Sequence, residues 1–177
     1  LGPPDSAAWV AQAGGVVVPY DDPTPDVVVA CDDEGYPFVE AVEAVISTLV
    51  ARIREGVTPR LVLPNPDRIY PGGEGRLRLT AGSTALVIDS ALAAVFGPDA
   101  PRFVGLGKPH AFIFEEACRR IGTSGRRVAM LGDQILTDVA GAKHAGLSAG
   151  LVATGIATAG HGELQPDFIV RCLLYTS

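Results

Sequence analysis

Short runs of β-branched and other apolar residues alternate along the chain with longer stretches in which apolar residues recur every three or four positions. The runs predict buried strands, and the stretches predict amphipathic helices. Strands are predicted at residues 16–18, 27–30, 61–63, 128–131, 149–153 and 168–170. Helices are predicted at residues 5–12, 38–55, 83–96, 111–121 and 137–145. Such alternation is typical of βα units around a parallel sheet, so we predict an α/β fold.

Two of the predicted helices have a defined apolar stripe. In the helix at 83–96 the stripe consists of Ala85, Ile88, Leu92 and Val95. In the helix at 111–121 it consists of Ile113, Ala117 and Ile121. Because residues three and four apart share one face of a helix, we expect these side chains to point toward the core.

The βα pattern is interrupted once, which suggests an insertion. An acidic, proline-rich stretch at 21–25 precedes a separate block of strands and helices, and Pro98 and Pro101 close that block. The pattern then resumes from Phe103. We therefore predict a Rossmann-like core whose segments are residues 1–25 and 101–170, with an α/β cap domain inserted at residues 26–100.

Composition limits the functional class. The 177 residues are 47% hydrophobic and 19% charged, as in soluble globular proteins. A net charge of −6 without a Lys/Arg cluster argues against a nucleic-acid partner. Cys31, Cys118 and Cys172 are widely spaced and include no CxxC, which favours a reducing, cytoplasmic location over a disulfide scaffold or a zinc site. No apolar run is long enough to cross a membrane.

Two aspartates bracket the turn that follows the predicted strand 128–131. Asp133 comes directly after Gly132, at the strand end where an open parallel sheet binds its ligands. A carboxylate oxygen there suits Mg²⁺. Asp138 opens the next helix, where it complements the helix dipole. The alternative is a tight turn followed by an ordinary helix-start residue, but the full string GDxxxTD after an apolar strand favours a functional site.

A lysine precedes this string by one βα unit. Lys108 lies between Gly107 and Pro109. A cation at this place would neutralise a transferring phosphoryl group or pair with neighbouring carboxylates. On its own, a lysine in such a turn is usually a solvated loop residue. Its position ahead of GDxxxTD favours the functional interpretation.

These segments resemble a known family. GKPHAFIFEEAC and the later VAMLGDQILTDVAGAKHAGLSAGLVATG are similar to motifs three and four of the haloacid dehalogenase superfamily. The similarity is strongest to subclass IIA, whose members carry a large α/β cap and include p-nitrophenyl-phosphatase-like and phosphoglycolate-phosphatase-like enzymes. PDVVVACDDEGYPF resembles the first strand and turn of that cap, and LVLPNPDRIYP resembles its asparagine–aspartate loop. The resemblance extends over roughly residues 2–170.

The resemblance implies a Mg²⁺-dependent phosphatase that hydrolyses a small-molecule phosphomonoester through an aspartyl-phosphate. Lys108 would be the catalytic lysine that steadies the nucleophile and the phosphate. Asp133 would be a Mg²⁺ ligand, and Asp138 would be the supporting acid of the metal site.

The resemblance also implies a substrate-facing cap loop that contains Asn65, Asp67 and Arg68, although a polar turn after a strand would have the same composition. Arg68 would favour an anionic phosphoester. Caps of this subclass also often mediate homodimers.

The family's nucleophile is the first aspartate of a DxD motif, which lies near the N-terminus ahead of a Ser/Thr motif. We expect this chain to begin after both motifs, as an N-terminally truncated fragment that contains no nucleophile and is inactive as given. One other candidate is Asp32, after the predicted strand 27–30. It would make Glu34 the acid and put Pro64 where a Ser/Thr is needed, and the spacing fits the cap better.

The end of the chain departs from the family pattern. Residues 171–177, with Cys172 among them, do not continue it, and we predict a non-native tail. Two other functions stay open at this point. One is a haloacid-dehalogenase-like binding or assembly protein that has lost its nucleophile. The other is a Rossmann-like nucleotide-binding module. The sequence argues against it, because it contains neither a GxGxxG motif that opens a helix after a strand nor a P-loop motif.

Overall fold

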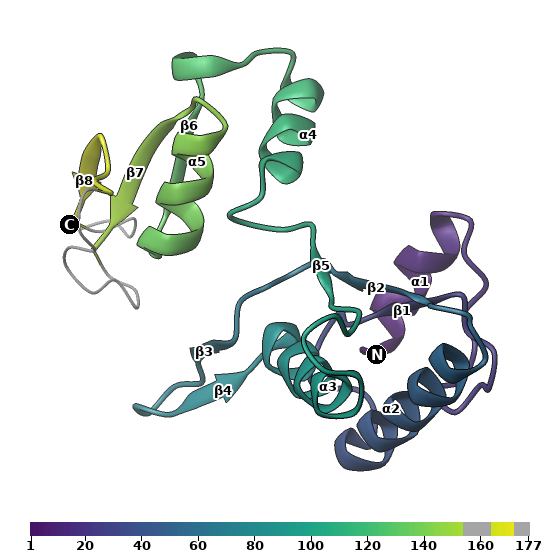
Figure 1. Ribbon diagram of the computed structural model, residues 1–177. Helices are drawn as coiled ribbons and strands as arrows, with labels where there is room; N and C mark the ends of the chain where they lie inside the picture. Colours follow the sequence, from purple (N-terminus) through teal and green to yellow (C-terminus); the bar gives the residue numbers. More distant parts are fainter. Residues whose placement is uncertain (154–163, 172–177) are drawn as a thin grey trace. The chain divides into compact units, whose positions relative to one another are not determined.

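A computed structural model describes residues 1–153 and 164–171 of the chain. Its contacts divide the chain into two compact units, Leu1–Gly105 and Leu106–Ser177 (Figure 1). Each unit has its own three-stranded parallel sheet, which confirms the predicted α/β class. The first unit takes in both the predicted segment 1–25 and the predicted insertion 26–100.

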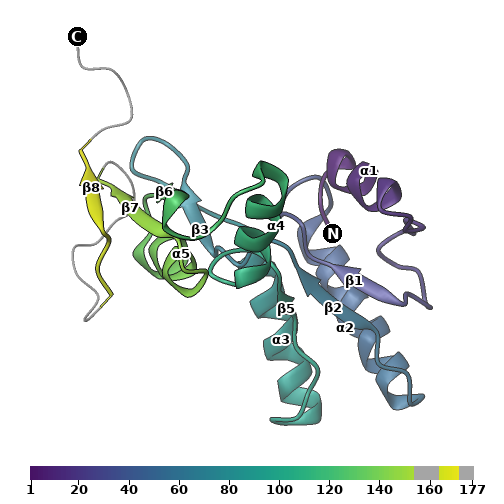
Figure 2. The same cartoon turned by 90° about the horizontal axis from the view of Figure 1, so that it is seen from above.

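The first unit is built on a sheet with the strand order β1-β2-β5. Its strands are β1 (Val27–Val29), β2 (Arg60–Leu63) and β5 (Val104–Gly105), and its two long helices are α2 (Phe38–Arg54) and α3 (Ala81–Phe96). The two helices lie side by side against the sheet (Figures 1 and 2). The core that they enclose consists of Val28, Val42, Val45, Leu49, Leu61, Ile88, Leu92 and Ala100.

A short antiparallel hairpin extends the loop after β2. It pairs β3 (Ile69–Pro71) with β4 (Leu77–Leu79), and the glycine-rich loop between the strands forms the turn. Arg78 Nη1 lies 2.9 Å from Glu34 Oε1 and so ties the hairpin to the loop after β1. The sequence pattern did not predict these strands, because each has only three residues and little alternation.

The first helix, α1 (Pro4–Gln12), confirms its prediction, but the strand predicted after it is wrong. Val16, Val17 and Val18 form no strand and are 88%, 51% and 43% exposed. The run is only three residues long. It lies between a glycine pair that ends the helix and Pro19, which has no N–H to donate to a sheet.

The second unit has the strand order β6-β7-β8. Its strands are β6 (Ala129–Gly132), β7 (Ser148–Val152) and β8 (Phe168–Val170), and its helices are α4 (Ala111–Ile121) and α5 (Ala140–His144). A π-helical turn (Ile135–Val139) leads directly into α5, and a 3-10 turn (Gly125–Arg127) precedes β6. The main buried side chains are Phe114, Ile135, Val139, Ala142, Leu147, Ala149 and Leu151.

The predicted inward face of α4 is wrong by one residue. Ile113 and Ile121 are 43% and 59% exposed, and Phe114 is buried instead. The sequence spacing allows either face. Phe114 faces Gly141 of α5, where an added Cβ would overlap the Phe114 ring, so the absence of a side chain makes room for the aromatic. In α3 the stripe through Ile88 and Leu92 is buried as predicted.

One residue of the predicted α3 stripe, Val95, does not face the core. Val95 lies in the last turn of the helix and is 47% exposed. The apolar stripe therefore ends one turn before the helix does.

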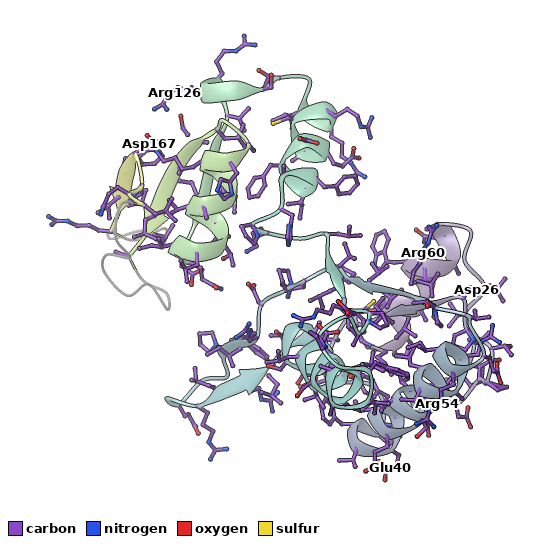
Figure 3. All side chains as sticks on the ribbon, viewed as in Figure 1. Asp26, Glu40, Arg54, Arg60, Arg126 and Asp167 are labelled. Atoms are coloured by element: carbon purple, nitrogen blue, oxygen red, sulfur yellow. The ribbon has the colours of Figure 1, made fainter. Side chains whose placement is uncertain are left out.

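Asp167, just ahead of β8, joins three parts of the second unit (Figure 3). Its Oδ1 lies 2.7 Å from Lys143 Nζ and 3.1 Å from Arg126 Nη2, and its Oδ2 accepts a 2.8 Å hydrogen bond from the Ala149 N–H. The hydrogen bond from Lys143, then those from Ala149 and Arg126, hold the pKa of the Asp167 carboxyl well below its ordinary value of 3.8. Asp167 therefore helps to hold β8 in register beside β7.

We expect Asp167→Asn to destabilise the second unit at about pH 7 and to do so less at about pH 3. The folded-state pKa is lowered, so the stabilisation is present above 3.8 and is lost as the pH falls toward the folded-state value. Urea unfolding of both proteins at the two pH values measures the difference. The control is Glu115→Gln on the exposed face of α4. An equal loss of stability at both pH values would contradict the role of the Asp167 charge.

Candidate active site

The structure brings together two of the residues that the sequence singled out. Lys108 lies in the segment between β5 and α4, and its Nζ is 2.7 Å from Asp138 Oδ1. The Asp138 side chain is only 2% exposed, whereas that of Lys108 is 29% exposed. A buried carboxylate needs a partner of opposite charge. The pair therefore fixes the Lys108 ammonium beside Asp138, on a side chain that is partly exposed to solvent.

The turn after β6 holds the Asp138 carboxylate. The π-helical turn carries Asp138 back toward the strand end, where the Gln134 N–H donates a 3.1 Å hydrogen bond to Asp138 Oδ2. Gly132 lies against this carboxylate, and an added Cβ would overlap it. The sequence suggested only a tight turn at Gly132-Asp133. In the structure, Asp138 fits against this position because Gly132 has no side chain.

A second glycine brings the lysine segment close to α5. An added Cβ on Gly141 would overlap the Phe114 ring and lie 3.1 Å from Pro109 Cα. Only a residue without a side chain allows this approach. Because Pro109 directly follows Lys108, the contact also fixes the lysine beside the turn that carries Asp138. Sequence analysis missed Gly141, for which the only signal was its place one turn after Asp138.

Asp133, the predicted metal ligand, lies half-buried at the carboxyl end of β6. Across residues 1–153 and 164–171, no three His, Cys, Asp or Glu side chains are close enough together to hold a metal ion. Both oxygens of Asp138 are engaged, one by Lys108 and one by the Gln134 N–H. Mg²⁺ commonly takes one or two protein carboxylates and completes its shell with water and phosphate oxygens. A single Asp133 carboxylate is compatible with that kind of binding.

The predicted cap-loop residues belong to the first unit. Asn65 Oδ1 accepts a 3.1 Å hydrogen bond from the Asp67 N–H, which closes a tight turn after β2. The Asp67 carbonyl accepts from the Gly82 N–H at 3.0 Å and from the Thr80 hydroxyl. The loop is therefore fixed to the start of α3.

These hydrogen bonds, which clamp the loop to the start of α3, continue one residue further along the loop. The Arg68 carbonyl accepts hydrogen bonds from the Thr80 N–H at 3.1 Å and from Ser83 Oγ at 2.6 Å. The side chains of Asn65 and Arg68 remain exposed. The loop thus presents two polar side chains from a fixed backbone. Sequence analysis could not predict this clamp, because backbone carbonyls accept most of its hydrogen bonds.

The alternative nucleophile, Asp32, also lies in the first unit. Its Oδ1 accepts a 2.8 Å hydrogen bond from the Asp33 N–H, and its carbonyl accepts one from the Tyr36 hydroxyl at 2.9 Å. Glu34 is paired with Arg78, and Pro64 follows β2. Burial first, and then the hydrogen bond with Asp32, raise the pKa of Asp33.

Two further predictions concern membranes and the end of the chain. In the part of the chain that the structure describes, no helix is both long and apolar enough to cross a membrane. Residues 172–177 of the predicted tail, with Cys172, lie outside the described residues.

Comparison with known proteins gives the same family as the motifs. The HAD-hydrolase-like family model matches residues 105–174, which contain Lys108, Asp133 and Asp138. The chain is 33% identical over 135 residues to dihydroxyacetone phosphatase of Corynebacterium glutamicum, a match that covers 76% of this chain and 44% of that protein. It is 31% identical over 112 residues to sugar-phosphatase AraL of Bacillus subtilis, covering 63% of this chain and 39% of that protein.

The chain thus spans less than half the length of these two relatives. Among solved structures, p-nitrophenyl phosphatase from Archaeoglobus fulgidus is similar with a TM-score of 0.67 and 28% identity, over 93% of this chain and 60% of that one. These likenesses confirm the resemblance that the motifs indicated. The chain belongs to the haloacid dehalogenase-like hydrolases.

Proposed function

We propose that this chain supplies the phosphate-binding and magnesium-binding part of a phosphatase that hydrolyses a small-molecule phosphomonoester. The observation that carries the proposal is the Lys108–Asp138 pair at the carboxyl end of β6, 2.7 Å between Nζ and Oδ1. The matched relatives named as a sugar phosphatase and a dihydroxyacetone phosphatase support the class of substrate.

Lys108 has the properties that phosphate binding requires. An ammonium has three N–H donors, and the Lys108 side chain, which contacts Asp138, is 29% exposed, so a phosphate could approach it from solvent. Phosphoryl transfer depends mainly on positioning and on charges fixed before the reaction. Asp138 would therefore act as a positioning residue, because it holds the ammonium of Lys108 in place.

Asp133 would hold the Mg²⁺ ion, together with water and phosphate oxygens. When bound, the ion supplies positive charge to the phosphoryl oxygens. Asp138 would support the metal site through Lys108 and the Gln134 backbone, since those groups already engage its two oxygens.

A nucleophilic aspartate is the remaining requirement of the aspartyl-phosphate mechanism. Among the described residues of the second unit, the other carboxylates are those of Glu115, Glu116 and Asp167. Glu116 is paired with Arg119 and Arg120 on α4, and Asp167 is bound to Lys143. We infer that the nucleophile lies outside the described residues of the second unit. Among the strands that the structure describes, β6 lies at the edge of its sheet, so another strand has a place beside it.

The first unit would then act as the cap. Its loop fixes the exposed side chains of Asn65 and Arg68, and Arg68 would favour phosphate esters that carry a second negative charge. A homodimer through this cap is part of the same proposal.

Hydrolysis of p-nitrophenyl phosphate tests the inferred lack of a nucleophile. With Mg²⁺ present, we expect the purified 177-residue chain to release nitrophenol no faster than a buffer blank, because removing a nucleophile costs on the order of 10⁶ in rate. Turnover that requires Mg²⁺ and disappears in Lys108→Met would contradict this inference while supporting the phosphatase assignment. Turnover that disappears in Asp32→Asn would assign the nucleophile to the first unit.

A further inference from the structure

The helix α3 is apolar on both its inner and its outer side. Its inner side contributes Ala85, Ile88 and Leu92 to the core of the first unit. Asp89 is the single charged residue among its 16 residues, and the Asp89 carboxylate accepts a 3.0 Å hydrogen bond from the Phe103 N–H. A helix that is apolar all round is normally covered on every side. We therefore expect the outer side of α3 to be covered as well.

The outer face of α3 is made of its five exposed residues, which are Leu86, Val87, Ser90, Ala94 and Val95. Leu86, Val87 and Val95 are 48%, 47% and 47% exposed. Residues 86, 90 and 94 are spaced four apart and so form one row along the helix. The outer face of α3 is thus a continuous surface that carries no charge.

The neighbouring helix α2 has the ordinary surface of a solvated helix. It is 17 residues long and lies beside α3 against the same sheet (Figure 2). Its exposed residues include Glu40, Glu43 and Arg54. Because the two helices have similar lengths and similar places in the fold, the contrast indicates that the outer face of α3 contacts another apolar surface.

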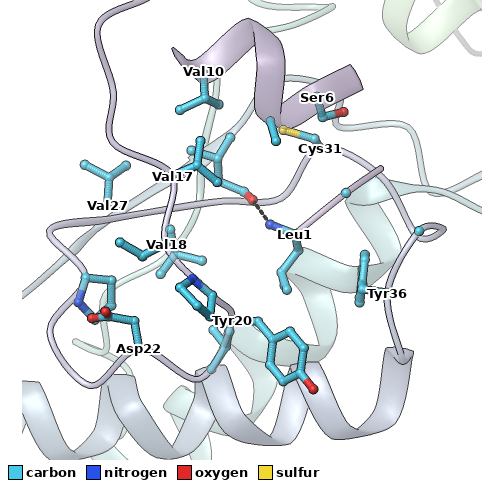
Figure 4. Close-up of a pocket in the computed structure, with 18 of the residues that line it drawn as sticks. Leu1, Ser6, Val10, Val17, Val18, Tyr20, Asp22, Val27, Cys31 and Tyr36 are labelled. Atoms are coloured by element: carbon cyan, nitrogen blue, oxygen red, sulfur yellow. Dashed lines mark hydrogen bonds between the residues drawn. The ribbon is translucent and has the colours of Figure 1, made fainter. Parts of the chain in front are cut away.

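Two other apolar surfaces of the first unit contain charged groups. The cavity of about 400 Å³ beside α1 and β1 has the Asp22 carboxylate in its wall (Figure 4). On the hairpin, the exposed Leu77 and Leu79 flank Arg78, which is paired with Glu34. Covering either surface would remove charged groups from water, which costs free energy. The outer face of α3 can be covered without that cost.

We infer that the outer face of α3 is the surface through which two copies of this chain associate. The chain has 20 acidic and 14 basic residues and a net charge of −6, so two copies repel each other over most of their surfaces. They can approach most closely where neither carries a charge. In a two-fold contact both copies present the same surface, so α3 of one copy packs against α3 of the other.

The dimensions of α3 suit a modest helix–helix contact. Its 16 residues make it about 24 Å long. The short side chains of Ser90 and Ala94 leave room for larger apolar side chains of the second copy. One helix face is smaller than a standard interface, so we expect a reversible dimer with a dissociation constant on the order of 10 μM. The inference deepens the proposed homodimer of the cap and rests on it, but it is independent of the phosphatase chemistry.

Sedimentation equilibrium of the whole chain tests for the dimer. As the concentration rises from about 1 to about 200 μM, we expect the average mass to increase from the 18.3 kDa of one chain toward twice that value. A chain that stays monomeric throughout would overturn both this inference and the cap homodimer. It would leave the phosphatase proposal standing, because the binding of Mg²⁺ and phosphate is measured separately.

Charged substitutions locate the contact. Leu86→Asp and Ser90→Glu each place a carboxylate on the outer face of α3 in both copies, and we expect each to raise the dissociation constant by about tenfold or more. Val39→Asp, at a residue of α2 that is 59% exposed, is the matched control and is expected to change the constant by less than about twofold. Circular dichroism checks that each variant folds, and either outer-face variant is sufficient.

The variants also show how the inference can fail on its own. A dimer that neither outer-face variant weakens would support the homodimer but overturn its assignment to α3. Equal weakening by Val39→Asp would reveal a general effect of added charge, and it would overturn the assignment in the same way.

Discussion

Replacing Lys108 with methionine is expected to lower the free energy of unfolding of the second unit by about 3 kcal/mol. The substitution leaves the Asp138 carboxylate, which is 2% exposed, without its cation. Loss of one partner from a buried pair costs about 3–5 kcal/mol, and the partial exposure of Lys108 puts this pair at the lower end. Urea unfolding followed through the amide resonances of β6 and β7 measures the second unit alone.

A double variant tests the physical reason for this loss. Lys108→Met combined with Asp138→Leu removes both charges and is expected to recover most of the stability, because an apolar pair of similar volume replaces the ion pair. Arg127→Met, at an exposed cation of the same unit, is the control and is expected to change little. If Lys108→Met matched that control, the ion pair would not be the main support of the turn after β6.

Replacing Gly132 with alanine is expected to cost about 2–3 kcal/mol and to displace the Asp138 carboxylate. Gly132 does not have a positive φ, so the backbone tolerates alanine, and the effect comes from overlap of the new Cβ with Asp138. The same urea measurement applies. Lys108 would lose its fixed contact, so we also expect a weaker response of this region to phosphate.

The control for Gly132→Ala is the same substitution in a protein that lacks the Asp138 side chain. In Asp138→Gly the whole side chain is gone, and the additional cost of Gly132→Ala is expected to fall to a few tenths of a kcal/mol, since the three atoms nearest the new Cβ all belong to the Asp138 side chain. An unchanged cost in that background would mean that Gly132 is needed for another reason, such as the shape of the turn itself.

The order of strands and helices was predictable because long apolar patterns dominate it. In the helix at 38–55 and the strand at 61–63, the spacing of the apolar residues and the length of the segment decide between helix and strand. The structure confirms both elements to within a residue or two. The inward face of α4 was not predictable. Two stripes one residue apart fit the same sequence, and the space beside Gly141, far along the chain, decides in favour of Phe114.

The site was only partly predictable for a related reason. Lys108 and Asp138 were found because their spacing fits a family motif, and the structure brings them into contact. Gly132 and the Gln134 N–H support that contact without any chemical signature of their own. The clamp of Thr80 and Ser83 on backbone carbonyls was missed likewise, since a sequence does not show which carbonyl a hydroxyl will reach.

The claim that Lys108, Asp133 and Asp138 form a magnesium and phosphate site is tested most directly by ¹⁵N NMR. The chain is titrated with Mg²⁺ and then with inorganic phosphate. We expect the amide resonances of residues 132–138 and of Lys108 to shift with the ions, and we expect Asp133→Asn to lose the response to Mg²⁺ while it keeps its fold. If those resonances stayed unchanged, or if Asp133→Asn responded as the wild type does, the site would not be the one proposed.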